Sequence, residues 1–275
     1  MNKSINQPLV SILNVTYNAE KFIKPTFDSL INQEYSNTEI LILDNNSQDK
    51  TSKILKEYEK KFSNIKTFLG DKNLGPYRGL NFLLNKAKGK YISITDHDDI
   101  YHPQKISKQV DFLSQNKKFV GCGTNLCKYF EKDSTFKYVK IKKQGTFAAH
   151  PSLVFRNKQG LKYNTKVKYK TDTYFMKYIL CKKKPLLYNI QEPLYLSRVR
   201  TDKRNLSYLW NEKLTFNEIW SYFDHSNDKK ALIKFMFKKI LNYNFFKNIF
   251  SEMGKESLNS LKNGDFFQDY LQYLK

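Results

Sequence analysis

Three carboxylates within four residues, Asp96, Asp98 and Asp99, directly follow an apolar run over residues 91–95 that predicts a buried strand. In an extended segment, residues two apart point to the same side, so we expect Asp96 and Asp98 to face one pocket while Asp99 turns inward to hold the loop. Carboxylate oxygens suit Mg²⁺ or Mn²⁺, which bind through one or two carboxylates together with the phosphates of a substrate. The cluster predicts a metal site for a phosphate-bearing ligand, although an isolated Asp-x-Asp is also typical of a solvated turn or helix cap.

Short apolar runs alternate with helix-like segments in the first hundred residues. Strands are predicted at 9–16, 40–43, 65–69 and 91–95, and helices at 20–32, from about 50, and at 76–87. Pro25 is the awkward residue of the first helix. Alternation of this kind indicates a Rossmann-like α/β fold, with a mixed, mainly parallel sheet flanked by helices, whose ligands bind at the carboxyl ends of the strands.

Polar residues follow three of these strands, at 16–18, 44–49 and 96–99, and we expect them to border one crevice. The first strand-to-helix turn contains no G-x-G-x-x-G, and the chain contains no G-x-x-x-x-G-K-[ST]. Dinucleotide-dependent oxidoreductases and P-loop enzymes are therefore excluded. The Gly-rich, basic loop that is typical of nucleotidyltransferases is missing as well.

The formal net charge of +22 is concentrated in the second part of the chain, because residues 1–115 carry +3 and residues 116–275 carry +19. Such a surface favours polyanions, either nucleic acid or an anionic bilayer, although a Lys-rich composition from an AT-rich genome is an alternative explanation. Three cysteines without a C-x-x-C pair, no signal-like N-terminus and no membrane-spanning run indicate a reduced, cytoplasmic protein that is soluble or peripheral.

Five motifs in register give the chain a family resemblance. The segments 10–18, 43–51, 73–78, 87–92 and 96–99, the last accompanied by Pro103 and Gln109, resemble the inverting nucleotide-sugar glycosyltransferases of family 2, which have the A-type glycosyltransferase fold. The resemblance continues more loosely through 150–156, 171–172 and 197–200 and fades after about Ser207. It implies a metal-dependent enzyme that moves a sugar from a nucleotide-sugar donor to a hydroxyl group.

The resemblance assigns roles on the donor side of the crevice. Asp98 is the expected ligand of Mn²⁺ or Mg²⁺, and Asp96 is expected to contact the ribose or the ion. Asp44 is expected to read the nucleobase, and since a uracil N3–H supplies the hydrogen that an ionised carboxylate lacks, UDP is the favoured nucleotide. The alternative for Asp44 is helix capping.

Three further nucleotide-sugar contacts are expected around this donor. Thr16 and Asn18 are expected to line the nucleotide pocket, and Arg78 to meet base or phosphate with its fork of donors.

On the acceptor side, the resemblance makes Asp172 the catalytic base of a direct displacement that inverts the anomeric centre. The alternative for Asp172 is an interaction with the helix dipole alone. His150, Arg198 and Arg200 are expected to contact acceptor or phosphate, and a structural role is equally open for His150. Relatives often carry a histidine that binds the metal at the position of Arg200. We therefore expect Arg200 to contact the pyrophosphate instead.

Residues 1–206 are predicted to form the catalytic domain, with a nucleotide-sugar-binding half at 1–112 and an acceptor half at 113–206. The acceptor half is expected to contain a strand at 152–155 and a helix at 172–181. Residues 207–275 are predicted to form a helical, basic and aromatic C-terminal extension, in which Lys230, Lys234 and Lys238 share one helical stripe. The helix that carries this stripe either lies on an anionic membrane or packs its apolar face on the catalytic domain.

The sequence thus predicts a glycosyltransferase that acts on a glycan or lipid-linked acceptor in surface polysaccharide synthesis, in the cytoplasm or on the inner face of the membrane. An inactive scaffold with the same fold, or a basic nucleic-acid-binding protein, is the alternative. The nucleic-acid-binding alternative is disfavoured because no nucleic-acid-binding motif is present and the acidic crevice would repel a phosphate backbone.

Overall fold

The computed structural model describes residues 7–201 together with Ser221 and His225. The predicted extension at 207–275, including its lysine stripe, therefore lies almost entirely outside the described residues. Among the described residues, no helix is both long and apolar enough to cross a bilayer. The three cysteines are buried and free, as their spacing predicts.

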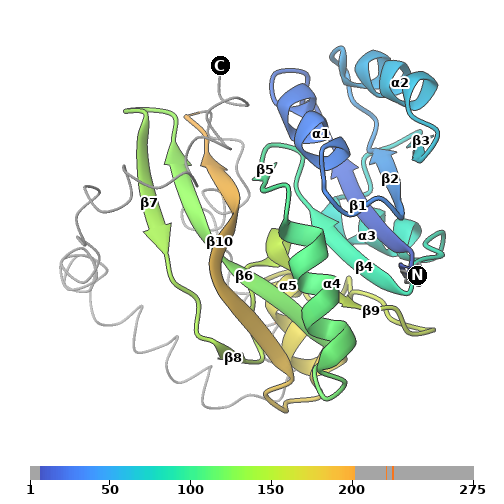
Figure 1. The fold of residues 1–275 in the computed structure, drawn as a ribbon. Helices are drawn as coiled ribbons and strands as arrows, with labels where there is room; N and C mark the ends of the chain where they lie inside the picture. The colour runs from blue at the N-terminus through green and yellow to red at the C-terminus, as the bar shows by residue number, and fades with distance from the viewer. Residues whose placement is uncertain (1–6, 202–220, 222–224, 226–275) are drawn as a thin grey trace, which may run out of the picture.

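One mixed sheet carries the fold, in the strand order β3-β2-β1-β4-β9-β6-β10-β5, with β7 added beside β6 and β8 beside β10 (Figure 1). The pairings of β1 with β2, β3 with β2, β4 with β1 and β10 with β6 are parallel. The strands are β1 Val10–Thr16, β2 Thr38–Asp44, β3 Ile65–Leu69, β4 Tyr91–Thr95, β5 Ile100–Tyr101, β6 Gly121–Phe130, β7 Thr135–Val139, β8 Gln144–Gly145, β9 Val154–Arg156 and β10 Leu187–Val199.

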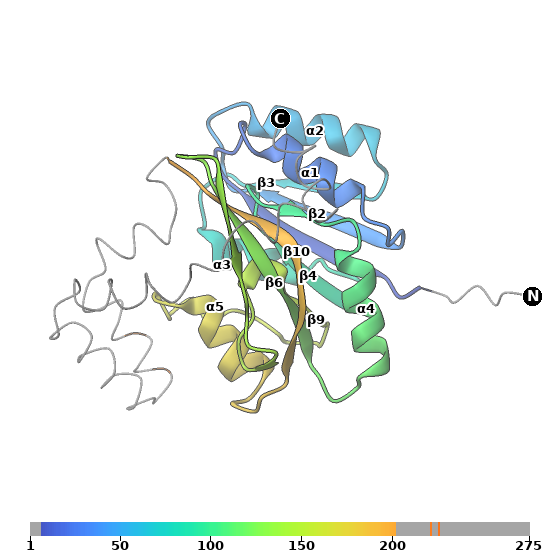
Figure 2. The ribbon, with the colours of Figure 1, turned by 60° about the vertical axis from the view of Figure 1, so that its left-hand side comes forward.

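Helices cover both faces of this sheet (Figure 2). The helices α1 Ile23–Ile31, α2 Thr51–Lys61 and α4 Lys105–Gln115 pack on one face, against side chains such as Ile12 and Ile40. The helix α3 Pro76–Leu84 and the segment that starts with α5 Thr171–Tyr174 pack on the other face, against Leu13 and Leu41. Both faces of the central strands are therefore buried, which explains why these strands read as unbroken apolar runs.

The local sequence explains where the helices begin and how closely they pack. Because α1 starts at Ile23, Pro25 lies in its first turn, where the missing N–H is not needed. In α3, a Cβ atom on Gly79 would stand 2.9 Å from the methyl groups of Val15, so only glycine allows this helix to lie so close to β1.

The predicted strands and helices of the first hundred residues are confirmed, with the first helix shorter than expected. The second part differs more. The helix expected at 172–181 is one turn of α-helix followed by a π-helix at Phe175–Leu180. The strand expected at 152–155 is a 3-10 turn at His150–Ser152 followed by the short β9. Because β4, β9 and β6 are neighbours, the sheet runs without a break across the predicted boundary at residue 112, and the division into halves stays a prediction.

Candidate active site

A pocket of about 350 Å³ lies at the carboxyl-terminal ends of β1 and β4. Parallel strands deliver their following loops to the same edge of the sheet, which is why residues far apart in sequence meet there. Its polar lining residues are Tyr77, Thr95, Asp96, His97, Asp98, Asp99, His150, Asp172, Tyr195, Ser197, Arg198 and Arg200.

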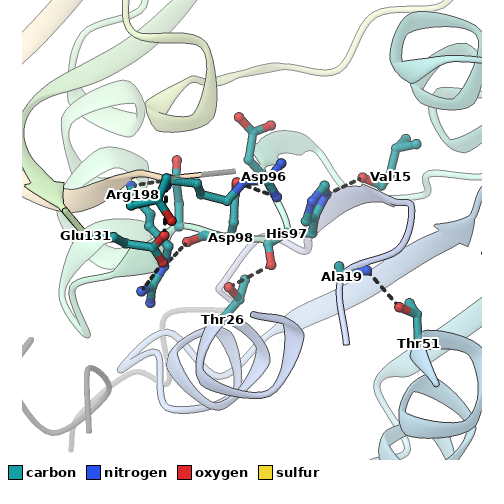
Figure 3. A network of polar contacts seen from close by, with 12 residues as sticks. Val15, Ala19, Thr26, Thr51, Asp96, His97, Asp98, Glu131 and Arg198 are labelled. Atoms are coloured by element: carbon teal, nitrogen blue, oxygen red, sulfur yellow. Dashed lines mark hydrogen bonds and ion pairs between the residues drawn. The ribbon is translucent and has the colours of Figure 1, made fainter. Parts of the chain in front are cut away.

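The acidic loop after β4 is held by hydrogen bonds from both sides. The backbone N–H of Asp96 donates to the hydroxyl of Tyr101 at 2.7 Å. Asp99 is buried, and one of its carboxylate oxygens accepts the backbone N–H of Arg198 at 3.0 Å. The side chain of Arg198 in turn donates to the carbonyl oxygen of Asp98 at 3.1 Å (Figure 3). Asp99 thus turns inward and fixes the loop on β10, as its place in the motif predicts.

Two arginines from the end of β10 bring positive charge to this loop. Arg200 forms an ion pair with the carboxylate of Asp98 at 3.3 Å, and both side chains are largely buried. Arg198 pairs with Glu131 at 3.2 Å. Both guanidinium groups also lie over the ring of Phe22, 5.4 Å and 5.1 Å from its centroid. A guanidinium held in this way is oriented toward the pocket before any ligand arrives.

The pocket holds more negative than positive charge. Loss of hydration, together with the carboxylates of Asp98 and Asp172, raises the pKa of Asp96 from 3.8 to about 7, and Arg200 acts in the opposite direction. Burial, followed by the charges of Asp98 and Asp96, raises the pKa of Asp99 well above its usual range. Carboxylates that repel one another in this way are stabilised by a bound cation.

Asp172 stands at the start of α5, directly after Lys170 and Thr171. Lys170 has a left-handed backbone, with φ of 49°, which turns the chain abruptly into the helix. One carboxylate oxygen of Asp172 accepts the N–H of Thr173 at 2.7 Å. Asp172 is therefore fixed at a helix N-terminus and lines the same pocket as the acidic loop.

An aromatic group packs behind Asp172. The rings of Tyr77 and Tyr163 are 5.5 Å apart, and His150 is hydrogen-bonded through Nε2 to the Tyr163 hydroxyl at 2.8 Å. Burial raises the pKa of Tyr77 well above 10, an effect that the charge of Asp172 strengthens and that a hydrogen bond from the backbone N–H of Asp172 opposes. Burial lowers the pKa of His150, which Asp172 partly offsets. The phenol and the imidazole are thus held neutral beside the carboxylate.

Four predicted nucleotide contacts, Thr16, Asn18, Asp44 and Arg78, are not brought into the lining of this pocket. Thr16 and Asp44 are neighbours in the β1–β2 register at the adjoining strand ends. The Asp44 carboxylate is buried and accepts the Ser47 N–H and the Ser52 hydroxyl. Ser47 lies in the turn before α2 and Ser52 in its first turn, and α2 has no side-chain cap, so these contacts show neither the nucleobase role of Asp44 nor its helix-capping alternative.

Asn18 and Arg78 lie outside this pocket, the first after β1 and the second on α3. Asn18 accepts the N–H of Gln48 at 2.8 Å, and Arg78 is exposed. Their roles as donor contacts remain predictions.

Tyr77, next to Arg78, is one of the pocket residues that were not predicted from the sequence. A signal for it exists, because Tyr77, Leu80 and Leu84 are spaced three and seven residues apart and share the buried stripe of α3. Arg78 lies off that stripe. His97 was missed as well: its Nδ1 contacts the carbonyl oxygen of Val15 at 3.4 Å, and its buried Nε2 has no hydrogen-bond partner within the described part of the chain (Figure 3).

The model of the family described as glycosyl transferase family 2 matches residues 11–181. The chain belongs to glycosyltransferase family 2. Among curated relatives, it is 30% identical over 262 residues to an uncharacterized glycosyltransferase of Methanocaldococcus jannaschii, covering 88% of this chain and 89% of that protein. It is 34% identical over 109 residues to the putative teichuronic acid biosynthesis glycosyltransferase TuaG of Bacillus subtilis, a match that covers 40% of this chain and 43% of TuaG.

Solved structures show that this glycosyltransferase has the A-type fold. The structure of S. aureus TarS 1-349 with UDP-GlcNAc superposes with a TM-score of 0.60 at 17% identity, over 77% of this chain and 69% of that one. The mannosyltransferase PcManGT of Pyrobaculum calidifontis, solved with GDP-Man and Mn²⁺, gives 0.57 at 16% identity, over 73% of this chain and 59% of that one.

The donor set of this family 2 enzyme fits a divalent ion that a ligand completes. Within residues 7–201, no three His, Cys, Asp or Glu side chains are grouped to hold a metal by themselves. Mg²⁺ and Mn²⁺ sites of one or two carboxylates are completed by phosphate oxygens and water. Asp96 and Asp98 could supply those carboxylates, since both line a pocket with excess negative charge. His97, between them in sequence, has a buried Nε2 without a hydrogen-bond partner within the described residues.

Proposed function

We propose that the protein is a metal-dependent, inverting glycosyltransferase that transfers a sugar from a UDP-sugar to a hydroxyl of a glycan or lipid-linked acceptor in surface polysaccharide synthesis. The observation that carries the proposal is the convergence of Asp96, Asp98, Arg200 and Asp172 on one pocket. TarS bound to UDP-GlcNAc and PcManGT bound to GDP-Man and Mn²⁺ support the donor and the metal, and the name of TuaG supports the pathway.

In this proposal Asp98 and Asp96 would hold the metal ion. The ion, when bound, neutralises the charge that develops on the leaving diphosphate. Arg200 stabilises the same charge because its guanidinium is already held beside Asp98 at 3.3 Å. Arg198 keeps the loop in place through the Asp98 carbonyl and the Asp99 carboxylate.

On the acceptor side, Asp172 accepts the proton of the attacking hydroxyl, and direct attack inverts the anomeric centre. The hydrogen bond from Thr173 orients one carboxylate oxygen, which leaves the other for the acceptor. His150, held neutral by burial, orders the aromatic wall beside Asp172 through Tyr163. A cytoplasmic location, at the inner face of the membrane, belongs to the same proposal.

Thermal unfolding with nucleotides and nucleotide sugars, each with and without Mn²⁺, tests the donor assignment. We expect UDP and UDP-sugars to raise the melting temperature only with Mn²⁺, since the ion links the carboxylates to the diphosphate. A larger shift with GDP or CDP would overturn the assignment to UDP. Binding without any release of UDP in the presence of hydroxyl acceptors would favour the inactive scaffold, and retention of the anomeric configuration in the product would refute the inverting mechanism.

A further inference from the structure

The end of the sheet opposite to the pocket carries a lysine-rich surface. Five separate chain segments, 87–91, 116–121, 141–146, 156–159 and 181–187, meet there and contain no Asp or Glu. We call the ten exposed lysines of these segments the lysine face. They are Lys88, Lys90, Lys117, Lys118, Lys142, Lys143, Lys158, Lys182, Lys183 and Lys184.

Strand directions place these segments at one end. β4, β6 and β10 run the same way, so the residues that precede them, at 87–90, 116–120 and 181–186, share an end of the sheet. β9 runs the opposite way, and residues 156–159 follow it to that same end. β8 pairs with the first residues of β10, which brings 141–146 alongside (Figure 1). The pocket lies at the other end, after β4.

Hydrogen bonds join the five segments into one continuous row. Asn157 donates its backbone N–H to the Lys90 carbonyl at 2.9 Å, and the neighbouring Arg156 N–H bonds the Val120 carbonyl at 3.0 Å. Val120 donates to the Leu186 carbonyl at 3.0 Å. The Gln144 side chain donates to the Pro185 carbonyl at 3.0 Å, which completes the row. The backbone under the lysines is thus fixed, and the charges belong to a single surface.

This positive charge is poorly compensated. None of the ten ammonium groups forms an ion pair within residues 7–201. Among nearby acids, Glu192 is already paired with Lys108, and Glu39 accepts the Ser11 hydroxyl and the Lys88 backbone N–H. Asp111 is a further acid within the described residues, on a surface that it shares with Lys143. The lysine face therefore presents a strong positive potential to the solvent.

We propose that the lysine face docks the protein on the anionic surface of a phospholipid bilayer. Its exposed cations are all lysines, which act as hydrated point charges and suit a diffuse layer of acidic headgroups, whereas base reading and bidentate phosphate contacts favour arginine. Single-stranded nucleic acid also calls for a row of aromatic stacking platforms. Among the described residues the exposed large apolar side chains are Tyr17, Leu69 and Phe147, and none belongs to the five segments.

Docking in this way fixes the orientation of the pocket. β4 connects the lysine face to the acidic loop, and the six steps from Lys90 to Asp96 span roughly 20 Å at about 3.3 Å per residue. The pocket then faces away from the headgroups, roughly that far above them. An acceptor hydroxyl that reaches it belongs to a glycan that extends from the bilayer, beyond the first sugar on a lipid.

Vesicle binding by the full chain tests the proposal. We would compare vesicles of phosphatidylcholine containing about one third phosphatidylglycerol with vesicles of pure phosphatidylcholine, by flotation at about 0.1 M salt. The test variant replaces Lys117, Lys118, Lys183 and Lys184 with glutamine. The matched control replaces Lys53, Lys56, Lys60 and Lys61, which are exposed on α2 beside Glu57 and Glu59, and so removes the same charge.

We expect the test variant to lower partitioning onto the anionic vesicles at least about tenfold and the control to lower it less than about twofold. Neither variant touches the pocket, so UDP release without vesicles should be unchanged in both. Equal losses in the two variants, full binding by the test variant, or no binding of the unmodified chain would overturn the proposal. The proposal would also be overturned if the test variant lost affinity for duplex RNA and the unmodified chain did not bind vesicles.

Discussion

The two ends of the sheet carry opposite charges and organise them differently. At the carboxyl-terminal end, two acidic side chains of the loop have a defined partner, the Arg200 guanidinium for Asp98 and the backbone N–H of Arg198 for Asp99. At the other end, the lysines are exposed and have no ion-pair partner within the described residues. In the pocket, single charged groups are held in fixed positions. On the lysine face, many hydrated charges add up to one surface potential.

This difference predicts how each end responds to substitution. Preorganised groups in a partly buried pocket act on the transition state one by one, so a single change there has a large effect on rate. Exposed lysines each add a small increment to a surface potential that salt screens, so only multiple changes matter. The predictions below test the contrast from the pocket outward.

Replacing Asp172 with asparagine should have the largest effect, a fall in kcat of about 10²–10⁴-fold with little change in the donor KM. The amide keeps the shape of the side chain and the hydrogen bond from Thr173 but cannot accept the acceptor proton. Steady-state UDP release with a hydroxyl acceptor measures the effect.

Asp49→Asn is the matched control for Asp172→Asn. Asp49 also lies at a helix start, where it accepts the Thr51 N–H at 2.9 Å, and it does not line the pocket. We expect the control to change the free energy of unfolding by less than about 0.5 kcal/mol, because asparagine accepts this hydrogen bond about as well as aspartate, and to leave kcat unchanged. Similar losses of kcat in the two variants would show that Asp172 only caps its helix.

Replacing Asp98 with asparagine should raise the Mn²⁺ concentration needed for half-maximal activity at least tenfold, since even indirect partners of a metal commonly contribute about 10–100-fold to its affinity. Titration of UDP release with Mn²⁺ measures the shift. Glu131→Gln is the control, because Glu131 pairs with Arg198 without lining the pocket. An unchanged Mn²⁺ requirement in Asp98→Asn would remove Asp98 from the metal site.

Tyr77→Phe should lower kcat by about tenfold, because it removes the phenol hydroxyl that lines the pocket with Asp172 and helps to position its carboxylate, a loss of about 1–3 kcal/mol for a buried polar contact. The ring contact with Tyr163 remains, so the donor KM should not change. Tyr58→Phe serves as the control, since the Tyr58 hydroxyl bonds Asp28 on the far side of the sheet. A rise in KM without a fall in kcat would show that Tyr77 contacts the donor instead of positioning Asp172.

The pocket end could be located from the sequence because its signals are local. The strands β1 to β4 are short apolar runs, and the rule that ligands bind at strand ends then brings the acidic loop and the end of β1 together. Asp172, Arg198 and Arg200 were found by motif resemblance alone, since no periodicity relates residues 172 and 198–200 to residue 96. The position of Arg198 and Arg200 is set by the parallel pairing of β10 with β6, which joins residues far apart in the sequence.

The lysine face could not be located in this way. Its lysines come from five segments that are adjacent only because β9 runs antiparallel between β4 and β6. The sequence indicated excess positive charge after residue 115 but not its position on the fold. The π-helix at Phe175–Leu180 was also missed, because an apolar stripe fits an α-helix and a π-helix equally over so few residues.

A buried lysine between the two ends should produce a smaller effect, on stability. Lys105 is fully buried at the start of α4 and donates to the Ser93 hydroxyl at 3.3 Å, and burial lowers its pKa from 10.5 to about 7. Between about pH 7 and 10.5 the unfolded chain therefore binds one more proton than the folded one. The free energy of unfolding then rises with pH by up to about 1.4 kcal/mol per unit, a gain that is absent below about pH 7.

Lys105→Met should remove this contribution, so the stability advantage of the variant over the parent is largest near pH 7 and shrinks as the pH rises. Urea unfolding at pH 7, 8 and 9 measures the difference. Lys108→Met, one turn later on α4 and paired with Glu192 at the surface, should show no such narrowing. A constant difference between Lys105→Met and the parent across this range would mean that Lys105 keeps its proton inside the fold. The core would then hold a charged ammonium group at Lys105, as the solvent-exposed lysine face does.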